Sequence, residues 1–174
     1  MKCSDMVAQV LARHVKHVFL VSGGADLHLV HSIDARDDID FICMQHEQAC
    51  SFAAEAYARL TGMGCAIATS GPGVINLLGG IAAAFYDSTP CIFIGGQVTT
   101  GRRRYNFANP PKQYGFQEME NVDIVKSITK YAVEVSDPAR VRYELDRCIA
   151  QAKCGRPGPT LLSLPDDIQR AEIA

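Results

Sequence analysis

Short apolar runs alternate with amphipathic stretches along the whole chain. Each run is continuous rather than alternating, which is typical of strands that are buried on both faces of a parallel sheet. The runs predict six strands, at 17–21, 39–43, 65–69, 91–94, 131–135 and 160–164. Gly95-Gly96 is expected to end the fourth strand, and Pro165 is expected to end the sixth.

Between these runs the apolar residues recur at helical spacing. Ser4 is expected to cap the first helix, and Gly62 is expected to end the long Ala-rich one. The predicted helices are 4–14, a short one at 27–33, 47–60, 74–86 and a last one that Asp137-Pro138 opens.

This alternation predicts an α/β fold of three layers, αβα, in which helices cover both faces of a six-stranded parallel sheet. We expect one domain over residues 1–174. In such folds ligands bind outside the carboxyl ends of the strands. The loops at that edge are 22–24, 44–47, 70–73 and 95–118, and the last is long and polar, as functional or mobile loops are.

The charge balance argues against several classes of partner. The chain has 17 Lys and Arg against 19 Asp and Glu, for a net charge of −2, whereas nucleic-acid grooves and membrane-binding surfaces need a dense basic field. No apolar run approaches the roughly 20 residues that span a bilayer. The first residues lack the pattern of a secretory signal. We therefore expect a cytoplasmic protein with neither a nucleic-acid nor a membrane partner.

The seven cysteines are scattered and never form Cys-x-x-Cys, so they predict neither a disulfide framework nor a zinc site. Cys43, Cys65 and Cys91 stand inside apolar runs and are expected to be buried.

Taken singly, the motifs are weak. Gly71-Pro72-Gly73 lacks the third glycine of a dinucleotide turn. His46-Glu47-Gln48-Ala49-Cys50 has Cys where a metalloprotease helix has its second His, so no metal site is predicted. Glu47 alone is explained as an acid favoured at a helix N-terminus. The run Arg102–Arg104 is interpreted as a solvated loop.

Taken together, the loop motifs indicate a protein family far more specifically than any one of them does. The chain resembles the N-terminal, pyrimidine-binding domain of thiamine-diphosphate enzymes of the acetolactate synthase type. The stretches that carry the resemblance are Gly23-Gly24-Ala25, QHEQA at 45–49, AAEAYAR at 53–59, TSGPG at 69–73 with Asn76, GGQV at 95–98, FQE at 116–118 and RPGP at 156–159 with Pro165.

The resemblance implies a role for each of five residues. Glu47 corresponds to the Glu that hydrogen-bonds N1′ of the aminopyrimidine and so assists removal of the thiazolium C2 proton. Pro72 and Asn76 would line the pyrimidine pocket. Gly24 would border the cofactor and, with Gln117, approach the reacting substrate.

The implied activity is decarboxylation of a 2-oxo acid such as pyruvate followed by carboligation, as in a transferase or lyase. The family binds the diphosphate through Mg²⁺ in a C-terminal domain marked by Gly-Asp-Gly, which this chain lacks. The chain would therefore hold half a site and be inactive alone. The resemblance leaves FAD open as a further cofactor, and nothing in the sequence indicates it.

Other interpretations stay open. The chain is either a fragment of a larger enzyme, a natural split subunit that needs a diphosphate-binding partner chain, or a non-catalytic module that kept the fold. Because such domains pack across a dimer interface in the family, we expect a homodimer or higher oligomer. The stretch between Val98 and Phe116 is longer and more basic than is typical of acetolactate synthases, which leaves room for another 2-oxo acid or another acceptor, including a sugar-nucleotide ketone.

Overall fold

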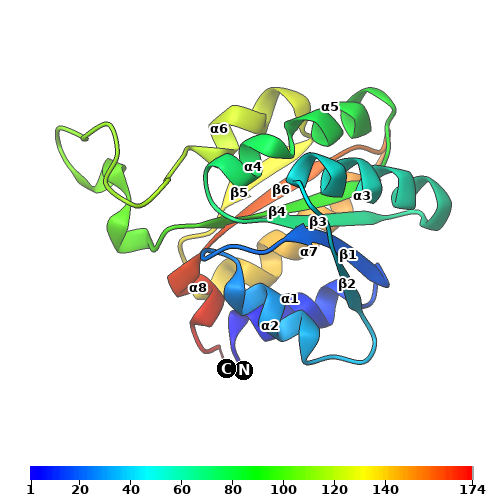
Figure 1. The fold of residues 1–174 in the computed structure, drawn as a ribbon, viewed down its shortest axis with the longest axis horizontal. Coiled ribbons are helices and arrows are strands. Elements are labelled where there is room, and N and C mark those ends of the chain that lie inside the picture. Colours follow the sequence, from blue (N-terminus) through cyan, green and yellow to red (C-terminus); the bar gives the residue numbers. More distant parts are fainter. Residues whose placement is uncertain (174) are drawn as a thin grey trace.

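Six parallel strands form the centre of the fold (Figure 1), which the computed structural model describes for residues 1–173. The strands lie in the order β2-β1-β3-β4-β6-β5, so the chain starts next to one edge of the sheet, adds β2 at that edge and then crosses to the other edge. They are β1 His17–Val21, β2 Asp40–Cys43, β3 Gly64–Ala68, β4 Cys91–Gln97, β5 Tyr131–Glu134 and β6 Thr160–Pro165. The predicted α/β fold with a six-stranded parallel sheet is confirmed.

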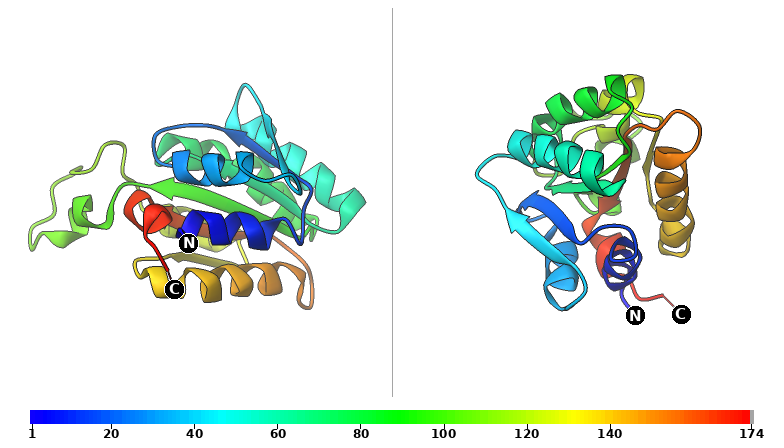
Figure 2. Two further views of the ribbon diagram at one scale, coloured as in Figure 1. Left: turned by 90° about the horizontal axis from the view of Figure 1, so that it is seen from below. Right: turned by 90° about the vertical axis from the view of Figure 1, so that its right-hand side faces the viewer.

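Helices cover both faces of this sheet (Figures 1 and 2). One layer holds α3 Glu47–Thr61, α4 Pro72–Asn76, α5 Leu78–Tyr86 and α6 Asn121–Val125. The other holds α1 Cys3–Leu11, α2 Leu27–Asp34, α7 Val141–Lys153 and α8 Asp166–Arg170. Four short 3-10 turns are η1 Thr100–Arg102, η2 Arg104–Asn106, η3 Lys126–Ile128 and η4 Pro138–Arg140.

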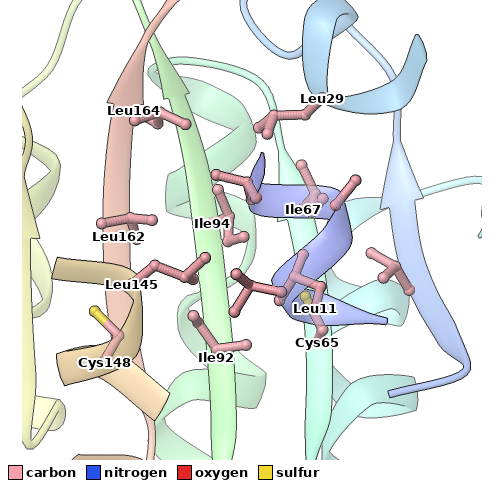
Figure 3. Packing of buried hydrophobic residues seen from close by; sticks show 14 of the residues in the cluster. Leu11, Leu29, Cys65, Ile67, Ile92, Ile94, Leu145, Cys148, Leu162 and Leu164 are labelled. Carbon is pink, nitrogen blue, oxygen red and sulfur yellow. The ribbon is translucent and has the colours of Figure 1, made fainter. Parts of the chain in front are cut away.

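The strands divide their side chains between two cores, because successive residues of a strand point to opposite faces. Cys65 and Ile67 of β3 join the core beneath α1, α2 and α7, which Figure 3 shows from close by. Ala66 and Ala68 face the other core, beneath α3 and α5. The continuous apolar runs are thus explained by burial on both sides.

The fourth strand does not end at Gly95-Gly96, as predicted, but continues through Gln97. A Cβ on Gly95 would lie 2.6 Å from a Val74 methyl group, and one on Gly96 would lie 2.3 Å from the carbonyl oxygen of Ala25. These glycines therefore let α4 and the turn after β1 pack closely on the strand. The sixth strand likewise includes Pro165, which is paired with Gln97.

The first helix differs from its prediction. It begins at Cys3 and ends at Leu11, and Ser4 is not its cap but a buried residue whose hydroxyl accepts a hydrogen bond from Ser32. Asp5 accepts from the backbone N–H of Lys2 instead. The predicted helix 74–86 is divided at Leu77 into α4 and α5.

Several later elements also differ from their predictions. α6 was not predicted, because its five residues are too few to show a helical period. Asp137-Pro138 opens the 3-10 turn η4, and α7 follows it. α8 comes directly after β6. Cys65 and Cys91 are buried as expected, but Cys43 is exposed because it ends the edge strand β2.

The segment 98–118, called the arm below, leaves the carboxyl edge of the sheet after β4 and projects beyond the helix layers (Figures 1 and 2). It contains η1 and η2. No helix within residues 1–173 combines the length and the apolar character that a membrane span requires.

Candidate active site

Glu47 is the first residue of α3, immediately beyond the carboxyl end of β2. The ring Nδ1 of His46 accepts the backbone N–H of Gln48 at 3.1 Å and so caps the helix. The helix ends at Gly62, whose φ of 86° is typical of a C-terminal glycine. The cap and the fifteen residues of α3 fix the backbone at Glu47, whose side chain is half-buried.

Asn76 holds one oxygen of this carboxylate. Its Nδ2 donates a hydrogen bond to Oε2 of Glu47 at 2.9 Å. Oε1 makes no hydrogen bond with any residue from 1 to 173, and a Cβ added to Gly73 would lie 3.6 Å from it. Glu47 therefore has one fixed oxygen and one oxygen that is free to bind a ligand.

Gln117 of the arm lies against Gly71, the residue before Pro72, at the turn between β3 and α4. Gly71 has φ 58°, and a Cβ there would lie 2.1 Å from the carbonyl oxygen of Gln117. Only glycine allows the arm to approach so closely. Pro72, the first residue of α4, is exposed, and Gln117 itself has φ 54°, which is uncommon for a residue with a side chain.

A cavity of about 620 Å³ opens at the same edge of the sheet. Gly24 and Gln117 line it together with Ser70 and Gln97, so two of the predicted residues share this space. Glu47 and Asn76 form a pair, and they are not among the lining residues. The five predicted residues thus fall into a carboxylate–amide pair, an exposed proline beside it, and two residues of the neighbouring cavity.

Asp26 is a buried acid that was not among the predicted site residues. Its Oδ1 accepts the backbone N–H of Gly23 at 2.7 Å, and its Oδ2 is buried with no hydrogen-bond partner in residues 1–173. The pKa of the Asp26 carboxyl is raised to about 6, chiefly by burial and to a smaller extent by the charge of Glu47, against the lowering effect of the Gly23 hydrogen bond. No motif or spacing in the sequence indicates this residue, because its pKa depends on burial.

Arg103 is not part of a solvated loop, and that interpretation was wrong for this residue. Its side chain is only 1% exposed. Its guanidinium donates to Glu120 at 2.8 Å and to the carbonyl of Met119 at 3.1 Å, and its Nε lies 3.3 Å from Glu134. Burial raises the pKa of Glu134 and the charge of Arg103 opposes that shift, so the arginine is the counter-charge of a buried carboxylate.

Within residues 1–173, no three His, Cys, Asp or Glu side chains are grouped as metal ligands. His46 uses Nδ1 for the helix cap, and the thiol of Cys50 lies 3.6 Å from the His46 carbonyl. The chemistry available at this site is that of a carboxylate held by an amide beside an open cavity.

The sequence matches the family model described as the thiamine pyrophosphate enzyme N-terminal TPP binding domain over residues 1–125. The chain is 38% identical over 174 residues to acetolactate synthase 2, chloroplastic, of Nicotiana tabacum, covering 97% of this chain and 24% of that protein. It is 39% identical over 160 residues to the mitochondrial acetolactate synthase of Schizosaccharomyces pombe, covering 91% of this chain and 23% of that protein.

A bacterial relative gives the same result: the large subunit of acetolactate synthase isozyme 3 of Escherichia coli is 35% identical over 164 residues, covering 94% of this chain and 27% of that protein. The chain spans about a quarter of the length of these relatives. It belongs to the thiamine pyrophosphate enzymes, as an N-terminal pyrimidine-binding domain related to acetolactate synthase large subunits.

Proposed function

We propose that this chain is the pyrimidine-binding half of a thiamine-diphosphate-dependent enzyme that decarboxylates a 2-oxo acid such as pyruvate and joins the remaining acyl carbons to a carbonyl acceptor. The observation that carries the proposal is the Glu47 carboxylate, with Oε2 fixed by Asn76 and Oε1 unpaired within residues 1–173 beside Gly73. The names of the relatives support the choice of reaction.

The site fits an aminopyrimidine. A ring nitrogen that carries or shares a proton needs a carboxylate oxygen without another partner, and Oε1 of Glu47 meets that requirement in the described part of the chain. Asn76 keeps the carboxylate in one orientation, and the missing Cβ at Gly73 leaves space next to Oε1. A charge-assisted hydrogen bond of this kind is among the stronger ones in proteins.

When bound, thiamine diphosphate would supply a nucleophilic thiazolium carbon and a ring that can take up the electron pair released with carbon dioxide. The role of Glu47 is to hold a proton at N1′ of the pyrimidine. Pro72 and Gly24 border the ring, and Gly24 and Gln117 face the substrate from the wall of the cavity.

The proposed function requires partners. Mg²⁺ and the diphosphate would be held by the family's C-terminal domain, on the same or on another chain. A second copy of this chain would pack on the exposed face of α3, where Ala49, Phe52, Ala56 and Leu60 recur at helical spacing. Phe52 is 44% exposed and Leu60 89%, so this stripe leaves apolar surface in water unless it is covered.

The test uses the chain together with a diphosphate-binding domain of the family, thiamine diphosphate and Mg²⁺. We expect release of carbon dioxide from pyruvate or another 2-oxo acid, and a decrease of about 100-fold or more in Glu47→Gln, the usual magnitude for loss of a general acid–base group. Glu172→Gln, an exposed glutamate near the chain end, is the matched control and should retain activity. Equal turnover in Glu47→Gln would contradict the proposal, and no turnover in the unsubstituted enzyme would favour a non-catalytic module.

A further inference from the structure

Positive charge is concentrated in the arm. The arm, residues 98–118, contains four of the seventeen basic residues and one of the nineteen acidic ones, Glu118, in a chain whose net charge is −2. The arm leaves the sheet at the carboxyl edge and projects outward (Figure 2). One of these basic residues, Arg102, lines the cavity.

Arg102 is the cation of the arm that faces the cavity. Its guanidinium makes no hydrogen bond or ion pair with any residue from 1 to 173, whereas Arg103 is neutralised by Glu120 and Glu134. A cation that lines a cavity without a protein partner is available to an anionic ligand.

The other charges of the cavity are already paired. Arg170 of α8 lies 3.5 Å from Asp166, and the same carboxylate lies 3.5 Å from the ring of His28. Thr100, at the base of the arm, donates both its backbone N–H and its hydroxyl to Asp167 of α8. Among the charged side chains of the described residues that line the cavity, Arg102 is therefore the one without a counter-ion.

The cavity is large for a small 2-oxo acid. Cavities of about 300–1,000 Å³ hold ligands of drug size, and this one has about 620 Å³ before any partner domain is added. Glu47 and Asn76 do not line it, so the side chains that would hold the pyrimidine lie outside this space. Phe116, which is 79% exposed, adds an apolar wall on the arm side.

We propose that the cavity is the acceptor subsite and that Arg102 binds a phosphate group of a phosphorylated carbonyl acceptor. Ser70 and Thr99 also line the cavity and add hydroxyl donors, which suits the three terminal oxygens of a phosphate better than the two of a carboxylate. Phe116 covers the apolar part of the same ligand.

This assignment rests on the proposed function. In the reaction the donor loses carbon dioxide, its former carbonyl carbon bonds to the carbonyl carbon of the acceptor, and the acceptor oxygen takes up a proton from solvent. The phosphate is not changed, so Arg102 acts in binding and selects the acceptor.

The test is a nuclear magnetic resonance titration of the 174-residue chain without cofactor, with ribose 5-phosphate as the phosphorylated probe and ribose as its neutral counterpart. We expect ribose 5-phosphate to shift the signals of Gly24, Thr99 and Gln117, and to bind about fivefold more weakly to Arg102→Gln, as loss of one partly exposed charge-assisted contact implies. Arg142→Gln on α7 makes the same charge change far from the cavity and should bind like the unsubstituted chain.

Three results would overturn the assignment: no binding of ribose 5-phosphate, equal affinity of the unsubstituted chain and Arg102→Gln, or equal binding of ribose and ribose 5-phosphate. 2-Oxobutyrate distinguishes the anion, because equal or tighter Arg102-dependent binding of this carboxylate would replace the phosphate assignment. Since the titration uses neither cofactor nor turnover, it can fail while the Glu47→Gln experiment succeeds, and the reverse holds too.

Discussion

A single amide decides how the Glu47 carboxylate is presented. Asn76 donates to Oε2 at 2.9 Å, and Asn76 is itself fixed as the last residue of α4. The family motif relates Glu47 to a cofactor, but the motif does not say which of its oxygens is available. The contact with Asn76 and the glycine at 73 supply that detail, because one occupies Oε2 and the other leaves Oε1 uncovered.

Asp26 gives a prediction about stability. The folded chain holds the Asp26 proton more tightly than the unfolded chain, because its pKa rises from 3.8 to about 6. The resulting stabilisation is fully present below about pH 4 and is lost as the pH rises through about 6. A shift of this size corresponds to about 3 kcal/mol. Asp26→Asn, which keeps an acceptor for the Gly23 N–H, should therefore gain stability relative to the unsubstituted chain as the pH rises.

Urea titrations at pH 4.5 and pH 8 measure this difference in the free energy of unfolding. Asp123→Asn removes an exposed carboxylate that pairs only with Lys126 at the surface, and its effect should be nearly the same at both pH values. If Asp26→Asn changed the free energy of unfolding by the same amount at pH 4.5 and pH 8, Asp26 would have the same pKa in the folded and unfolded chains, and the prediction would be wrong.

The candidate site could be predicted only where residues form a recognisable pattern. Glu47, Pro72 and Asn76 belong to motifs at fixed spacing, and the structure brings two of them into contact. Asp26 and Arg103 could not be predicted, since burial and partners decide their properties. Each is a charged residue in a loop, a position where most charges are solvated, and only tertiary packing removes these two from water.

At the level of elements, the arm is held by its base. Gln97 at the end of β4 donates to the carbonyl of Met119 at 2.8 Å, and Glu118 accepts the backbone N–H groups of Arg104 and Tyr114. Arg103 connects the same base to the edge strand β5 through Glu134. The arm is thus anchored at the sheet while its outer part projects.

Arg103→Met should therefore destabilise the fold. The substitution leaves the Glu134 carboxylate buried without its counter-charge, which costs about 3 kcal/mol or more by analogy with other broken buried pairs. The free energy of unfolding in urea checks this. Arg142→Met, which breaks an exposed pair with Asp146, should change it by less than about 0.5 kcal/mol. Similar values for the two variants would contradict the anchoring role.

The elements could largely be predicted, because strands buried on both faces show as apolar runs and long helices show a clear period. The errors have local causes. Gly95 and Gly96 were predicted to end the fourth strand, but they lie inside β4 and allow neighbouring segments to pack closely on it. Ser4 looked like a cap, yet it is buried against Ser32. Short elements such as α6 have too few residues to show any period.

For the molecule as a whole, the two layers of helices differ in what they leave exposed. The stripe of Ala49, Phe52, Ala56 and Leu60 on α3 is apolar, and it begins two residues after Glu47. An interface on this helix would bring the sites of two copies near each other and would shield the stripe from water. Self-association and the active site would then share one element.

Phe52→Glu should weaken self-association, because it places a charge in the centre of the proposed interface. Sedimentation velocity over a concentration series should show a dimer or larger species for the unsubstituted chain and a shift toward monomer for the variant. Tyr143→Glu, at an aromatic position on α7 that is also exposed, is the control and should leave the association unchanged. A chain that stays monomeric at the highest concentration would contradict the proposed interface.

The proposed function depends above all on activation of the cofactor by Glu47. The most direct measurement is the rate of hydrogen–deuterium exchange at C2 of thiamine diphosphate, in the enzyme completed by a diphosphate-binding domain. The exchange needs no substrate, so it separates cofactor activation from substrate binding. We predict a decrease of about 100-fold or more in Glu47→Gln with the fold unchanged. An exchange rate equal to that of the unsubstituted enzyme would contradict the assignment of Glu47.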